Sequence, residues 1–88
     1  MKLIRKLRVK NSMGLHTRPA TLIVKLLQNS KSDILFTYKR LTVNAKSILS
    51  LLMLAAKKNS TITVTILGED AEEMMLKLSQ AFETQFGD

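Results

Sequence analysis

The chain has 88 residues, which suffice for one hydrophobic core and predict a single domain over residues 1–88 without a large enclosed active site. It has one histidine and no cysteine, which excludes disulfides, thiolate chemistry and a zinc-type cluster, so neither a metal nor a cofactor is expected. The net charge is +7, yet thirteen Lys and Arg residues face one acid over residues 1–68, whereas six acids face one lysine over residues 69–88.

Apolar runs are too short to cross a bilayer anywhere in the sequence, and charges interrupt the first residues at Lys2, Arg5 and Lys6. We therefore expect a cytoplasmic protein with no membrane insertion. The basic charge favours an anionic partner of some kind, because long-range fields speed encounter without specifying what is met.

The first predicted element is a strand in which Leu3, Leu7 and Val9 alternate with cations, although Arg5 interrupts the apolar row. Residues 11–16 form a turn-rich loop. Apolar residues then recur at helical spacing and predict a helix over roughly residues 17–28.

The middle of the chain predicts a hairpin and a short helix. Residues 29–32 end the first helix, and Ile34 and Phe36 begin a second strand that reverses between Tyr38 and Asn44 into a third. The reversal carries Lys39 and Arg40 in place of the Asn-Gly that primed turns favour, so its geometry is left open. Ser47 can cap a short helix that contains residues 48–53.

The last third predicts the clearest strand and a final helix. Residues 61–66 alternate threonine with Ile or Val, which is typical of a strand with one apolar face. Asp70 and Glu73 make a capping-box start, and an apolar stripe continues to Phe86. The order βαββαβα predicts an α+β fold in two layers, with a four-stranded sheet covered by helices on one face only.

The most informative segment is Gly14-Leu15-His16-Thr17-Arg18-Pro19-Ala20. Proline fits the first turn of a helix, where a missing N–H costs nothing, so Pro19 places His16 at or beside the N-cap. First-turn N–H groups and the helix dipole attract an anion there, and Arg18 can offer a planar guanidinium to a phosphoryl group on the imidazole. A histidine at a helix start is also commonly only a cap, and Arg18 can equally be a solvated residue.

This segment resembles the phosphohistidine motif of HPr, the carrier of the bacterial phosphoenolpyruvate-dependent phosphotransferase system. Val43-Asn44-Ala45-Lys46-Ser47-Ile48 resembles the second motif of that family, and the resemblance covers essentially the whole chain. It implies an open-faced β-sandwich with a four-stranded antiparallel sheet and three helices on one face. It also implies a carrier protein rather than an enzyme.

By this resemblance, His16 accepts a phosphoryl group on Nδ1 from phospho-Enzyme I and passes it to an enzyme IIA domain, while Arg18 stabilises the group. Ser47 would be the target of an HPr kinase/phosphorylase, although its role as a mere N-cap is an equal alternative. The implied docking residues for partners are Thr17, Ile48, Leu49, Leu51 and Leu52. A short amphipathic helix buries one face, so about half of the α-helical docking residues are expected in the core.

A second hypothesis is a small basic α+β module that binds nucleic acid. The cations of the first strand, together with Lys10, Lys39 and Arg40, could contact several phosphates. Interleaved aromatics that stack on bases are missing, with Tyr38 the only nearby candidate, so nucleic acid is the less favoured partner.

Overall fold

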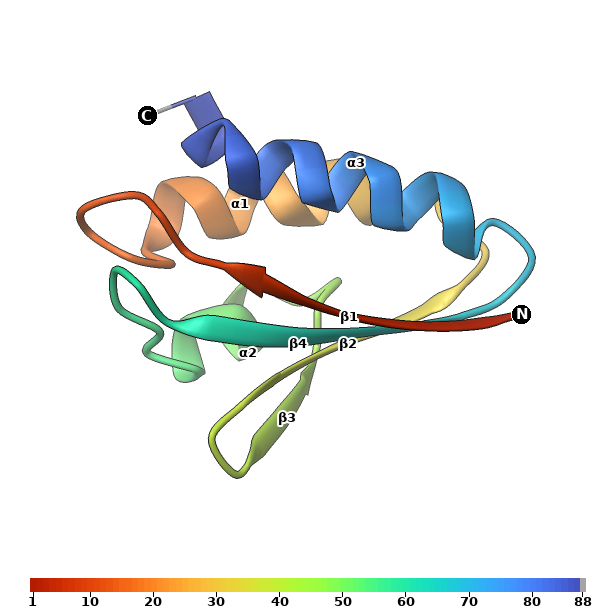
Figure 1. Cartoon of the computed structure of the whole chain (residues 1–88), viewed down its shortest axis with the longest axis horizontal. Coiled ribbons are helices and arrows are strands. Elements are labelled where there is room, and N and C mark those ends of the chain that lie inside the picture. The colour runs from red at the N-terminus through yellow and green to blue at the C-terminus, as the bar shows by residue number, and fades with distance from the viewer. Residues whose placement is uncertain (88) are drawn as a thin grey trace.

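The computed structural model describes residues 1–87, and its helices and strands follow the predicted order (Figure 1). Asp88, the last residue of the predicted domain, lies outside the described residues. The strands are β1 (Lys2–Arg8), β2 (Asp33–Tyr38), β3 (Leu41–Asn44) and β4 (Thr61–Leu67). The helices are α1 (Thr17–Leu27), α2 (Ile48–Met53) and α3 (Ala71–Glu83), followed by a 3₁₀ turn over Gln85–Gly87.

The four strands form one antiparallel sheet in the order β1-β4-β2-β3. The central strand β4 confirms its predicted pattern, because Ile62, Val64 and Ile66 are fully buried while the alternating Thr61, Thr63 and Thr65 face the other way. Along residues 61–66, one side of the sheet is therefore apolar and the other is polar.

Helices α1 and α3 lie across the apolar side of the sheet (Figure 1), and α2 packs against α1 and β3. One cluster of buried residues joins these layers, and fully buried side chains of this size each contribute about 1.5–3 kcal/mol through removal from water. Its largest fully buried members are Phe36, Phe82, Ile23, Leu27, Ile34, Leu51, Ile62, Ile66, Met75 and Leu78. The open-faced α+β sandwich is thus confirmed.

The final helix ends earlier than the apolar stripe predicts. It stops at Glu83, and Phe86 lies in the following turn with a φ of 54°. Phe86 is nevertheless buried, because its ring meets that of Phe82 edge to face at 5.0 Å between centroids. Burial of the ring, and not helical periodicity, sets the position of this residue.

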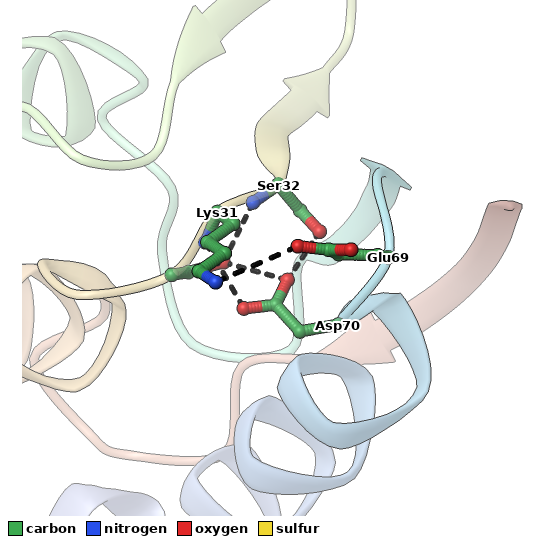
Figure 2. Close-up of polar contacts among 5 residues, drawn as sticks. Lys31, Ser32, Glu69 and Asp70 are labelled. Atoms are coloured by element: carbon green, nitrogen blue, oxygen red, sulfur yellow. Dashed lines mark hydrogen bonds and ion pairs between the residues drawn. The ribbon is translucent and has the colours of Figure 1, made fainter.

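The predicted capping box at Asp70 and Glu73 is wrong. Asp70 is the N-cap of α3, but its side chain makes no bond to the helix, and Glu73 pairs with Lys77 at 3.1 Å. The Asp70 carboxylate instead accepts hydrogen bonds from the loop between α1 and β2 (Figure 2): from the Ser30 hydroxyl at 3.0 Å, from the Lys31 N–H at 3.0 Å and from the Ser32 hydroxyl. The carboxylate therefore ties two segments that are distant in sequence.

These hydrogen bonds lower the pKa of Asp70 from its ordinary value of 3.8, chiefly through the Ser32 hydroxyl and then the Lys31 N–H. A carboxylate whose pKa is lower in the folded state stabilises the fold above its unfolded pKa, and this stabilisation disappears as the pH falls through the folded value. We expect Asp70→Ala to lower the melting temperature at pH 7 and to lower it much less at pH 2.

The measurement is a series of thermal melts between pH 2 and pH 7. Glu72→Ala is the matched control, because Glu72 is an exposed acid in the first turn of the same helix. An equal decrease for Asp70→Ala at both ends of the pH range would show that the carboxylate charge is not what connects the loop to α3.

Candidate functional site

His16 lies at the N-cap of α1, as the position of Pro19 predicts. Its backbone is extended, with φ −86° and ψ −169°, and its carbonyl accepts the first helical hydrogen bond, from the Ala20 N–H at 3.1 Å. The His16 side chain makes no cap bond to the helix and is partly exposed. The imidazole is therefore not used as a helix cap, which was the structural alternative for this residue.

The first turn of α1 surrounds the imidazole with groups that suit an anion. Thr17 and Arg18 are exposed at its first two positions, Pro19 is buried at the third, and the turn contains no acidic residue. The N–H groups of a first turn have no acceptor within their own helix, and the dipole adds partial positive charge. This end of α1 therefore favours a negatively charged group beside His16.

The loop before His16 is held against the segment between α2 and β4. The Leu15 N–H donates to the Ala56 carbonyl at 2.9 Å, and Leu15 itself is buried. Gly14 has a φ of +66°, and a β-carbon there would lie 2.2 Å from the Ala56 oxygen. Only glycine fits this approach, so Gly14 positions the residues that follow it.

Asn11 also holds this loop in place, and it is a residue of the site that the sequence does not indicate. Its side chain is almost fully buried and donates from Nδ2 to the Gly14 carbonyl, while the Gly14 N–H donates to the Asn11 carbonyl at 3.0 Å. The only sequence signal was an Asn two residues beyond a strand, which is common in ordinary turns. Its role depends on burial, which local sequence does not show.

Ser47 is the N-cap of α2, and its hydroxyl accepts a hydrogen bond from the Ser50 N–H at 3.3 Å. Helix α2 contacts α1, so the two helices that carry the predicted site residues are neighbours. The exposed residues of α2 are apolar: Ile48 is 38% exposed, Leu49 is 70% exposed and Met53 is 62% exposed.

The predicted docking residues divide between surface and core. Thr17, Ile48 and Leu49 are exposed, Leu52 is partly exposed, and Leu51 is fully buried. Leu51 is therefore a core residue that a partner cannot contact without a change in packing. This division fits the expectation that a short amphipathic helix buries one face.

Over residues 1–87, no three or more His, Cys, Asp or Glu side chains gather in a way that could hold a metal ion. Within the same residues, none of the helices has the length and apolar character needed to cross a membrane.

Comparison with known proteins adds an independent line of evidence. The sequence model of the family described as "PTS HPr component phosphorylation site" matches residues 3–84. The phosphocarrier protein HPr of Chlamydia pneumoniae is 45% identical over 80 residues, which cover 91% of this chain and 74% of that protein. The phosphocarrier protein HPr of Xylella fastidiosa (strain Temecula1) is 37% identical over 83 residues, which cover 94% and 93% of the two chains.

A solved structure agrees with these matches. The crystal structure of HPr-C-His from Thermoanaerobacter tengcongensis superimposes with a TM-score of 0.93 at 31% identity, and the match covers 98% of this chain and 97% of that one. The open-faced α+β sandwich of this chain is therefore also the fold of a solved HPr structure. The chain belongs to the HPr family of the phosphotransferase system.

Proposed function

We propose that this protein carries a phosphoryl group on His16, accepting it from phospho-Enzyme I and donating it to an enzyme IIA domain. The observation that supports this most strongly is the placement of a partly exposed imidazole at the N-cap of α1, where first-turn N–H groups and the helix dipole favour an anion. In this proposal the whole chain, residues 1–88, acts as one domain in the cytoplasm, and the protein is a carrier rather than a catalyst.

The chemistry requires little from the protein beyond position and charge. The bond between phosphorus and its donor atom on Enzyme I breaks as the new bond to Nδ1 of His16 forms. In the second transfer, the P–N bond of His16 breaks as a bond to an acceptor side chain of the IIA domain forms. Phosphoryl transfer depends on in-line placement and on stabilisation of the phosphoryl oxygens. First-turn N–H groups and the Arg18 guanidinium would supply that stabilisation.

A shallow site suits this exchange because two proteins must reach the same imidazole in turn. The exposed apolar residues Ile48 and Leu49 lie on α2, next to α1, and would give each partner a surface to bury. The test of acceptance is incubation with Enzyme I and phosphoenolpyruvate, followed by fragmentation mass spectrometry. Phosphate on a residue other than His16 would contradict the proposal.

We expect Arg18→Ala to slow phosphoryl transfer in both directions by about tenfold or more while leaving affinity for Enzyme I largely unchanged, because the guanidinium acts on phosphoryl oxygens. Arg18→Lys should restore only part of the rate, since an ammonium loses the planar fork. Rapid-quench kinetics measure both variants. Lys25→Ala, which removes a cation from the last turn of the same helix, is the control.

Wild-type transfer rates in Arg18→Ala would show that the N–H groups at the start of α1 stabilise the phosphoryl oxygens without the guanidinium. An equal decrease in Lys25→Ala would instead assign the effect to net charge.

Phosphorylation of Ser47 by an HPr kinase/phosphorylase is the regulatory part of the proposal. Ser47→Asp, a mimic of that phosphate, should stabilise the protein by about 0.3–1 kcal/mol, because a negative group meets the positive end of α2. The same charge beside Ile48 must lose water when an apolar interface closes over it, so affinity for Enzyme I should fall.

Thermal melts and titration calorimetry measure the two effects together. Gln80→Glu, which adds one negative charge at an exposed position of α3, is the control. Unchanged affinity in Ser47→Asp would mean that Ser47 lies outside the docking surface and acts only as a cap.

A further inference from the structure

The open face of the sheet, opposite α1 and α3, has a regular pattern that phosphotransfer does not use. Cross-strand pairing aligns Ile4 with Thr65 and Leu35, and Lys6 with Thr63 and Thr37. Lys2 and Asp33 pair with Leu67, and Arg8 pairs with Thr61. The face is therefore apolar where β1 begins and basic and threonine-rich where β1 ends.

The apolar half is exposed and hollowed. Three apolar side chains of this half are exposed to solvent: Ile4 of β1 is 61% exposed, Leu67 of β4 is 51% exposed and Leu35 of β2 is 39% exposed. Leu35 and Leu67 line a hollow of about 450 Å³, and its charged lining residues are Lys2, Lys46 and the single acid Asp33. A concave apolar surface with a few charged groups at its rim is typical of a binding site.

The charges on this face lack acidic partners. Within residues 1–87, three acids of α3 and its preceding loop form ion pairs, with Lys10, Lys31 and Lys77, and none of these lysines belongs to the sheet. No carboxylate in the same residues forms an ion pair with Lys2, Lys6 or Arg8, and Asp33 is the one acid among the paired positions of the open face. This arrangement favours a partner that is acidic, and the open faces of two copies of this chain would repel each other.

An acidic partner could be a nucleic acid or a protein, and the positions of the aromatic residues distinguish these two classes. Tyr38 occupies the same side of β2 as the buried Ile34 and Phe36 and packs against the core, so the open face offers no ring on which a base can stack. A hollow lined by Leu35 and Leu67 instead fits an apolar side chain of a protein.

We propose that the open face is a second docking surface, for an acidic protein partner that inserts an apolar side chain between Leu35 and Leu67. The hollow lies by the start of β1, whereas α1 begins beyond the far end of that strand (Figure 1), and seven strand residues span about 20 Å. A partner on this face therefore leaves His16 accessible. The surface does not depend on phosphotransfer, so a failure of the function proposed above leaves this inference standing.

The test uses a short peptide of glutamates around two central leucines, with a peptide in which serines replace the leucines and a single-stranded oligothymidylate as comparisons. Backbone amide shifts locate the binding, and titration measures affinity. We expect shifts at Ile4, Leu35 and Leu67, with weaker binding of the serine peptide and of the oligonucleotide.

Four variants in matched pairs test the charge and the hollow separately. Lys6→Glu should weaken binding about tenfold, whereas Lys25→Glu, on α1, should change it no more than about twofold. Leu67→Ser should weaken binding, whereas Leu76→Ser, at a similarly exposed position on α3, should not.

Shifts confined to α1 and α2, equal effects of Lys6→Glu and Lys25→Glu, or no binding by any probe would overturn the proposal. Tighter binding of the oligonucleotide on the same face would assign the surface to nucleic acid and overturn it as well. Unchanged phosphorylation of Lys6→Glu by Enzyme I would support the separation of the two surfaces, and a large decrease would contradict it.

Discussion

Replacing His16 with alanine is expected to abolish phosphate uptake from phospho-Enzyme I while leaving the fold intact. No other residue among those at the N-terminal end of α1 offers a nitrogen nucleophile at the same point, and the chain has no second histidine. His16 is an N-cap residue, and loss of an N-cap side chain costs up to about 2 kcal/mol of stability, so the variant should still fold. Intact mass and far-ultraviolet circular dichroism measure the two properties.

Ser12→Ala is the matched control, because Ser12 is an exposed residue of the loop before His16 and has no part in the proposed site. It should still become phosphorylated. Phosphorylation of His16→Ala by Enzyme I would place the acceptor elsewhere in the chain.

We expect the second large effect for Gly14→Ala, because Gly14 allows the loop before His16 to pack against Ala56. A φ of +66° costs a residue with a β-carbon about 1–3 kcal/mol, and the clash with the Ala56 carbonyl at 2.2 Å adds to that cost. The loop must move to relieve the clash, and movement of His16 by about 1 Å is enough to slow transfer by about a hundredfold.

Gly87→Ala separates these two causes. Gly87 also has a positive φ, of +81°, but a β-carbon there would meet nothing within 4 Å, so this variant has the strain without the clash. Urea unfolding and phosphotransfer rates should both be much more affected in Gly14→Ala. Equal losses of stability in the two variants, with normal transfer in Gly14→Ala, would show that the contact with Ala56 does not position His16.

Local patterns were sufficient for most of the fold. The alternation in residues 61–66 and the helical spacing after Pro19 depend on neighbouring residues, and both elements formed where the patterns indicated. Two details depended on distant residues. The Asp70 carboxylate accepts hydrogen bonds from a loop about forty residues earlier and not from its own helix. Phe86 leaves the helical conformation because its ring packs against that of Phe82.

The turn at Lys39 and Arg40 is a further detail that local sequence could not predict. Pairing of Tyr38 with Leu41 closes the hairpin over these two residues, and Lys39 takes a φ of 55° although it is neither glycine nor asparagine. Strand pairing on both sides imposes a conformation that the turn residues do not prefer. Sequence could therefore identify a reversal there but not its backbone geometry.

The site was predictable to the extent that it is continuous in sequence. His16, Thr17 and Arg18 lie in one motif that also contains the helix start, so their grouping followed from Pro19. The anchoring contact between Gly14 and Ala56 joins residues from two loops, and the buried side chain of Asn11 has no sequence signal of its own. The open face was seen only as basic, because its apolar hollow depends on the register between β1, β4 and β2.

The central claim is that the chain carries phosphate between two proteins, and a reconstituted relay tests it directly. The protein is phosphorylated with Enzyme I and phosphoenolpyruvate, separated from both, and mixed with an enzyme IIA domain while the intact masses of both chains are followed. The account predicts a gain of one acid-labile, base-stable phosphoryl group, followed by its loss from this chain and its appearance on the IIA domain. A chain that gains no phosphate, or that keeps it in the presence of the IIA domain, would contradict the account.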